Sequence, residues 1–145
     1  MKDFDEYQRM MRYRNGHHSF FLTLALILLN VLIEMMRGIG WGVSNSVETL
    51  VIFSVSIIFF NVMNTLQGAY FRKAEKPLWG NLGILTAGVI YCLIYFDSNP
   101  NPAQELLLDG KVTIRAVQFL VILNAFSIPL TYFIKYFIDR KNEDF

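Results

Sequence analysis

Four long stretches of the chain are nearly free of charge, and they constrain its fold more than any other feature. They cover approximately residues 19–39, 47–71, 78–96 and 114–138. Each reaches the roughly 20 apolar residues that a helix needs to cross a hydrocarbon layer about 30 Å thick. Backbone groups inside a membrane must be satisfied internally, and these runs lack the alternation of barrel strands. The sequence therefore predicts an all-α integral membrane protein, a four-helix transmembrane bundle running up-down-up-down.

The composition agrees with this fold class. Hydrophobic residues make up 54% of the 145 positions, which is too apolar for a surface solvated by water. The first run is longer than the apolar region of a signal peptide and lacks a cleavage site, so we expect it to be retained. No repeat or linker marks a second domain. Residues 1–145 are therefore expected to form a single membrane domain.

Basic residues predict the orientation. Ten of the 13 lysines and arginines precede the first run, join the second to the third, or follow the fourth. These are Lys2, Arg9, Arg12, Arg14, Arg72, Lys73, Lys76, Lys135, Arg140 and Lys141. The positive-inside rule then places both termini in the cytoplasm, with the chain in the plasma membrane. The net charge of +1 gives no reason to expect nucleic acid binding, while contacts with anionic lipid remain open to these basic side chains.

The first 16 residues, "MKDFDEYQRMMRYRNG", are rich in helix formers. Phe4, Tyr7 and Met11 share one face of such a helix. Residues 1–16 are therefore predicted to form a cytoplasmic amphipathic helix lying on the inner leaflet, separate from the first span. Asn15 and Gly16 are expected to end it.

The loop "DSNPNPAQELLLDGK" between the third and fourth runs allows two structures. Asn101 as N-cap, Pro102 in the first turn and Gly110 after the last turn predict a short outer helix. Asp109 followed by Gly110 between apolar residues instead predicts a hairpin turn. The helix is favoured because its cap and proline signals agree with each other.

Motifs that carry catalytic or metal chemistry are missing from the sequence. Cys92 is the only cysteine, which excludes an internal disulfide and a Cys-x-x-Cys redox pair. His17 and His18 are adjacent, so on a helix their rings diverge and are poorly placed to chelate one ion. We therefore expect a protein that is not an enzyme, with no metal site and no cofactor.

Several amides fall near the middle of the predicted spans. Asn30, Asn61 and Asn124 are placed close to one depth, and Asn64 continues the polar stripe on the second helix. Such side chains usually face other helices rather than lipid. They either clamp the bundle together, which is the favoured interpretation, or line a solvated cavity or binding site. Pro129 is expected to act as a hinge that bends the fourth helix close to Asn124.

Glu34 is an acid near the outer end of the first span, one turn beyond Asn30. Arg37 on the same helix and Arg115 at the start of the fourth helix are its candidate partners, and Arg115 is slightly favoured. A structural ion pair is the favoured role. An acid that binds a proton or a cation is the alternative.

The opening "FDEYQRMMRYRNGHHSFFLTLALILLNVLIE" resembles the start of small, uncharacterised multi-helix membrane proteins of Gram-positive bacteria. These begin with an acidic-polar element, then a basic element, a glycine and a serine-led first helix. The matching residues here are Asp5, Glu6, Gln8, Arg12 to Arg14, Gly16 and Ser19, while Tyr7 departs from the usual arginine. These proteins are domains of unknown function, so the resemblance implies a bacterial plasma membrane and no particular activity.

Two classes of function fit these features. The first is a non-enzymatic accessory or interaction protein of the membrane, whose partners are the lipid bilayer and either another membrane protein or a second copy of this chain. The alternative is a small proton- or cation-coupled transporter or binding protein that uses Glu34 and the midplane amides.

Overall fold

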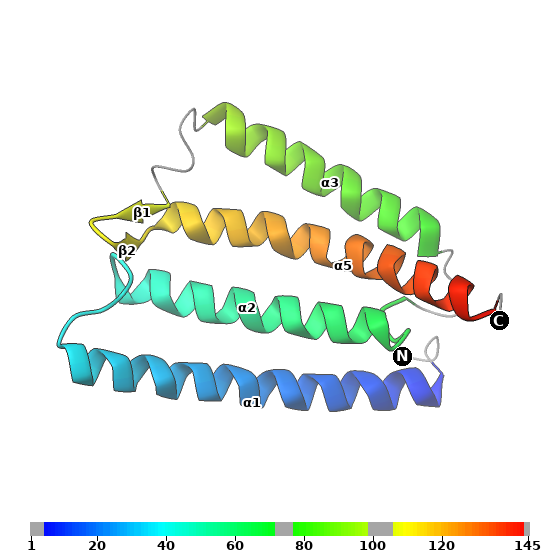
Figure 1. Ribbon diagram of the computed structural model, residues 1–145, viewed down its shortest axis with the longest axis horizontal. Helices are drawn as coiled ribbons and strands as arrows, with labels where there is room; N and C mark the ends of the chain where they lie inside the picture. The colour runs from blue at the N-terminus through cyan, green and yellow to red at the C-terminus, as the bar shows by residue number, and fades with distance from the viewer. Residues whose placement is uncertain (1–4, 72–76, 99–105, 144–145) are drawn as a thin grey trace.

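The computed structural model describes residues 5–71, 77–98 and 106–143. Its elements are α1 (Glu6–Arg37), α2 (Asn45–Leu66), α3 (Pro77–Ser98), β1 (Leu107–Leu108), β2 (Lys111–Val112) and α5 (Ile114–Glu143), shown in Figure 1. All four helices are long and apolar enough to cross a membrane. The prediction of four such helices packed against each other in an all-α protein is therefore confirmed.

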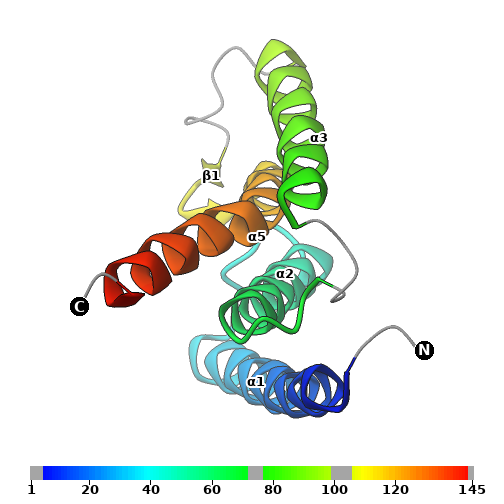
Figure 2. The ribbon, with the colours of Figure 1, turned by 90° about the vertical axis from the view of Figure 1, so that its right-hand side faces the viewer.

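The helices lie in a row in the order α1, α2, α5, α3. α1 packs along α2, α2 along α5, and α5 along α3. Figures 1 and 2 show α2 and α5 between the two edge helices, and the colours in Figure 1 show that helices next to each other in sequence run in opposite directions. We call the end where α1 begins and α5 ends the proximal end. The opposite end, with the α1–α2 loop and the strands, is the distal end.

α1 is one continuous helix of 32 residues, so the prediction that Asn15 and Gly16 end a separate interfacial helix is wrong for the described residues. Asp5 caps the helix by accepting a hydrogen bond from the Gln8 N–H. Asn15 is fully buried against α2, and this tertiary contact outweighs the local preference of Asn and Gly for a helix end. At 1.5 Å per residue α1 is about 48 Å long, which exceeds the hydrocarbon thickness.

Glycines in the left-handed conformation end the first two helices. Gly38 has φ 67° and its N–H donates to the Glu34 carbonyl at 2.8 Å. Gly68 has φ 67°, and the N–H of Ala69 reaches back to the Asn64 carbonyl at 2.8 Å, as in a Schellman motif. α2 therefore stops at Leu66, five residues before the predicted end at residue 71.

A hairpin lies between α3 and α5, so the favoured prediction of an outer helix is wrong for residues 106–112. β1 pairs antiparallel with β2, and the turn residues Asp109 and Gly110 both have positive φ, as a two-residue hairpin requires. The predicted cap at Asn101 and Pro102 lies outside the described residues. β2 also bonds the α1–α2 loop, because Val112 exchanges hydrogen bonds with Trp41 and Val43 at 2.9 Å each.

α3 meets α5 at a glycine. A Cβ added at Gly88 would lie 3.4 Å from the Ala125 Cβ and 3.5 Å from the Phe126 ring, so the two helices approach closely there. Small residues allow such approaches between membrane helices. Gly83, earlier on the same helix, has no atom within 4 Å of an added Cβ.

These two glycines make a matched pair of variants. Gly88→Leu is expected to lower the free energy of unfolding by about 1–3 kcal/mol, because a bulky side chain forces α3 away from α5. Gly83→Leu is the control, since both changes replace a glycine inside the same helix. Unfolding in detergent micelles measures the difference. Equal stability of the two variants would contradict the α3–α5 contact.

Candidate functional site

The most buried acid in the described chain is Glu48, in the first turns of α2. Its side chain is 1% exposed. Glu48 Oε2 accepts a hydrogen bond from Asn30 Nδ2 of α1 at 2.9 Å, and Oε1 accepts one from the Gly42 N–H at 2.8 Å. This carboxylate of α2 therefore bonds both α1 and the intervening loop, and so holds the two helices together at the distal end.

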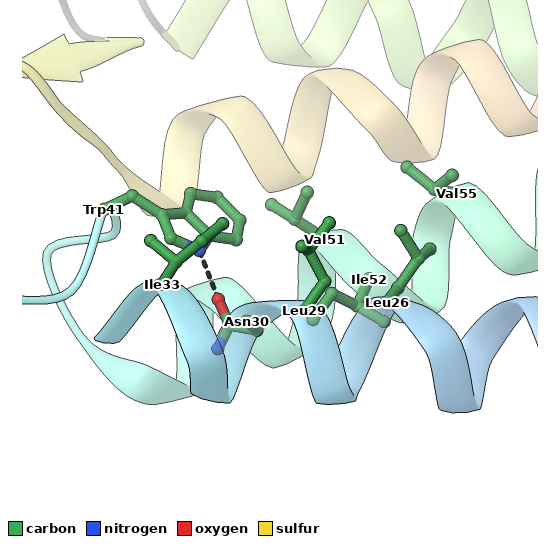
Figure 3. A pocket seen from close by; sticks show the side chains of 8 residues that line it. All are labelled: Leu26, Leu29, Asn30, Ile33, Trp41, Val51, Ile52 and Val55. Carbon is green, nitrogen blue, oxygen red and sulfur yellow. Dashed lines mark hydrogen bonds between the residues drawn. The ribbon is translucent and has the colours of Figure 1, made fainter. Parts of the chain in front are cut away.

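Trp41 completes this group, which we call the distal tie and define as Asn30, Trp41, Gly42 and Glu48. The indole N–H donates to Asn30 Oδ1, as Figure 3 shows. Asn30 thus donates to the carboxylate and accepts from the indole, which uses both ends of its amide. Ser44 begins α2 as its N-cap and brings Glu48 under the loop.

Two glycines make room for the carboxylate. A Cβ added at Gly40 would clash with Glu48 Oε1, and one added at Gly42 would lie 2.7 Å from Glu48 Cγ. The pattern Gly-Trp-Gly therefore lets the loop backbone close over the acid. In the described chain no ion pair neutralises Glu48, so its two hydrogen bonds are the compensation for burial.

A pocket of about 190 Å³ opens beside the distal tie, between α1 and α2. Figure 3 shows its lining, which is Leu26, Leu29, Asn30, Ile33, Trp41, Val51, Ile52 and Val55. Asn30 and Trp41 bond each other at one end, and the remaining six side chains are aliphatic. The pocket therefore suits an apolar group and presents little that would recognise a polar ligand.

The structure does not bring Glu34 together with its predicted partners. Glu34 is half-buried, and in the described chain no ion pair joins it to Arg37 or Arg115. α2 lies between α1 and α5, which keeps the fourth helix away from Glu34. Arg115 instead donates to Gln118 at 3.2 Å. The distal acid that ties helices together is Glu48.

The predicted midplane amides separate into different contacts. Asn61 Nδ2 donates to Asn124 Oδ1 at 2.8 Å, joining α2 to α5, whereas Asn30 belongs to the distal tie. Ser127, near Asn124, donates to the Asn124 carbonyl at 2.7 Å. α5 continues through Pro129, whose side chain is fully buried. The predicted bend at Pro129 stays a prediction.

Asn64 takes part in a second group near the proximal end. Asn15 Nδ2 donates to Asn64 Oδ1 at 3.0 Å and to Gln67 Oε1 at 2.9 Å, joining α1 to α2. Asn15 and Asn64 are 0% and 1% exposed. Asn15 Oδ1 and Asn64 Nδ2 are buried without a hydrogen-bond partner, which leaves a donor and an acceptor in the same contact.

Two further side chains of α1 hold the segment that follows α2. Gln8 Nε2 donates to the carbonyl oxygens of residues 68 and 71 at 2.9 and 3.0 Å. Arg12 donates to those of residues 69 and 70 at 2.7 and 2.8 Å. α2 has no basic residue in its last turn, so Arg12 supplies positive charge near that helix end. Burial raises the pKa of the nearby Tyr70 phenol, and Arg12 partly offsets the rise. We call Gln8, Arg12, Asn15, Asn64 and Gln67 the proximal tie.

Sequence reasoning missed Glu48 and Asn15. An acid four residues after an N-cap serine is usually a solvated first-turn residue, so Glu48 carried no obvious signal. The Gly-Trp-Gly pattern before it was the available clue, because two glycines flanking an aromatic residue permit a close approach. The sequence Asn15-Gly16 predicts a helix end instead of a buried contact. Among the described residues no three His, Cys, Asp or Glu side chains gather as metal ligands.

Glu48→Gln tests the distal tie. Both oxygens of Glu48 accept hydrogen bonds, whereas glutamine has one oxygen and one NH2 group. The NH2 group would point at a donor, either the Asn30 amide or the Gly42 N–H, and that hydrogen bond would be lost. We expect the free energy of unfolding in detergent to fall by about 1–3 kcal/mol because a buried donor is left unsatisfied. Glu34→Gln is the matched control and should change stability by less than about 0.5 kcal/mol, as expected for sites without specific partners. A larger loss for Glu34→Gln than for Glu48→Gln would reverse the assignment.

Comparison with known protein families, curated proteins and solved structures found no match for this chain. Its role is therefore inferred from its own residues. The resemblance of its first 35 residues to small membrane proteins of Gram-positive bacteria stays a prediction.

Proposed function

We propose that this chain is a non-enzymatic, four-span protein of a bacterial plasma membrane that acts as an accessory or interaction protein. Insertion is supported by apolar side chains on the surface of every helix. Phe20, Leu32 and Met35 of α1 are 62%, 55% and 77% exposed, and Leu93 of α3 is 66% exposed. Large apolar side chains exposed in such number call for lipid or protein cover.

The proposed orientation has the proximal end in the cytoplasm. Arg9 and Arg14 lie near the start of α1, and Arg140 lies near the end of α5. The distal end has Arg37, Lys111 and Arg115. With Arg12 and Lys135, the proximal end has five basic residues whose side chains the structure describes, against three at the distal end, which supports cytoplasmic termini under the positive-inside rule.

One observation carries the interaction role. The amides that were candidates for a transport site each bond a side chain of a neighbouring helix. Asn61 bonds Asn124, whereas Asn30 bonds Glu48 and Asn64 bonds Asn15. Meanwhile α1 and α3, the edge helices, each pack along a single neighbour. Polar groups thus serve internal cohesion, and the outward apolar faces of α1 and α3 are available to a partner protein or a second copy.

A small proton- or cation-coupled transporter or binding protein is the second candidate. The observation that favours it is the burial of Glu48 without an ion pair among the described residues, which makes this acid a stronger candidate than Glu34. A cation bound at this carboxylate would offset the cost of burying its charge. Proton-coupled flux in liposomes that is lost in Glu48→Gln, with the fold retained, would favour this candidate over the first.

Cysteine labelling tests the orientation. In a Cys92→Ala background, we expect Ser46→Cys, at the exposed distal start of α2, to react with an impermeant thiol reagent in intact cells. Glu6→Cys, at the start of α1, and Arg140→Cys should react only after the cells are opened. All three positions are exposed and lie near helix ends, so access to the reagent should differ by side of the membrane. Labelling of Glu6→Cys in intact cells would refute cytoplasmic termini.

Site-specific photo-crosslinking in native membranes tests the interaction role. A benzophenone amino acid at Leu32 of α1 or Ile90 of α3, which are 55% and 53% exposed, should give an adduct heavier than the chain by a whole protein. The same amino acid at Leu130 of α5, which is 62% exposed, is the comparison. Adducts at Leu32 or Ile90 but not at Leu130 would place the partner at an edge helix. Recovery of lipid adducts alone at every position would count against a protein partner.

A further inference from the structure

The first turns of α1 have an outward face that none of the interactions above use. Gln8, Arg12 and Asn15 point toward α2 and the segment after it. The exposed side chains of these turns include Arg9, Met10, Tyr13, Arg14 and His17. Tyr13 is 67% exposed and Met10 is 56% exposed, so this surface combines an amphipathic and an apolar side chain with two guanidinium groups.

This face has a net positive charge, because Arg9 and Arg14 outnumber Glu6, which lies beside Arg9, Met10 and Tyr13. The sequence has no acidic residue between Tyr7 and Ile33. The Arg12 charge is directed at backbone carbonyls of the neighbouring segment, whereas the guanidinium groups of Arg9 and Arg14 make no hydrogen bond or ion pair in the described chain. Exposed guanidinium groups bind phosphate oxygens well, because their planar forks match phosphate geometry.

The position along α1 fits the border between headgroups and hydrocarbon. His17 contacts Phe21 edge-to-face with ring centroids 4.7 Å apart, and apolar side chains follow from Phe20 onward. Arg14 is seven residues before Phe21, or about 10 Å along the axis, a distance that a long basic side chain spans from the headgroup layer. The proximal tie fixes this face in place because Gln8 and Arg12 bond the α2–α3 connection.

We propose that this face of α1 binds an anionic phospholipid of the adjoining leaflet. Arg9 and Arg14 contact the phosphate, Tyr13 and His17 lie at headgroup level, and the acyl chains follow the exposed surface of Phe21 and Leu24. The occupant is assigned by charge complementarity, since a headgroup without an ammonium group leaves the phosphate charge for the two arginines. The proposal rests on insertion of the chain in a membrane and is independent of the accessory role.

The test uses the full chain in nanodiscs of mixed phosphatidylglycerol and phosphatidylcholine, with lipid retention measured by native mass spectrometry. The wild type should retain phosphatidylglycerol preferentially. Arg9→Gln and Arg14→Gln should each lower this preference about fivefold, the usual effect of one basic residue near a membrane surface. Arg14→Lys should keep most of it, because the positive charge remains.

Arg37→Gln is the matched control, since Arg37 is an exposed arginine at the other end of the same helix. An unchanged preference in the Arg9→Gln, Arg14→Gln double variant would overturn the proposal, as would an equal loss in Arg37→Gln. A chain that does not insert would retain neither lipid, which distinguishes failure of the membrane assignment from failure of the lipid site. Capture of an acidic protein by this face with no lipid preference would also overturn it.

Discussion

Burial of the Glu48 carboxylate is the interaction on which the distal half of the molecule depends. The acid bonds Asn30 of α1 and the Gly42 N–H, and the loop that it holds exchanges hydrogen bonds with Val112, which leads into α5. One side chain therefore connects three of the four helices, directly or through a strand. Glu48 has no ion pair in the described chain, so the folded distal end depends on the hydrogen-bond donors around this carboxylate. Removing them would cost several kcal/mol, because a buried charge would lose its partners.

The row arrangement follows from where the polar ties lie. α2 has one face bonded to α1 through Glu48 and Asn64 and another bonded to α5 through Asn61. A helix tied on two sides becomes interior, and a helix tied on one side stays at an edge. α3 contacts α5 at the small residue Gly88 and packs along no other helix of the described chain, so it is the second edge of the row. The edge helices consequently expose the apolar faces that a membrane or a partner must cover.

The number, type and approximate positions of the helices could be predicted because they depend on the length of apolar runs, a property of the local sequence. The predictions are wrong where contacts between residues distant in sequence determine the structure. Asn15 and Gly16 have the composition of a helix end, but burial of Asn15 against Asn64 keeps α1 continuous. The role of Glu48 depends on the α1–α2 loop, which folds back over its carboxylate. The spacing of residues along α2 does not predict this contact. Glu34 interrupts an apolar run and is therefore predicted to pair with an arginine, yet α2 separates it from the arginine of α5.

The two ends of the molecule differ in how completely their polar groups are satisfied. In the distal tie, both carboxylate oxygens of Glu48 and both ends of the Asn30 amide have partners. The buried side-chain atoms without hydrogen-bond partners in the described chain belong to Gln8, Asn15, Asn64 and Asn81. These residues lie in the proximal halves of α1, α2 and α3. Individual amide contacts between membrane helices average only about 0.6 kcal/mol, so the proximal pairs can exchange partners at small cost. Separating Glu48 from its donors is far more costly. Any rearrangement on binding a partner protein should therefore exchange amide partners at the proximal end, where Gln8 and Arg12 still hold the first turns of α1 in place, and leave the distal end closed.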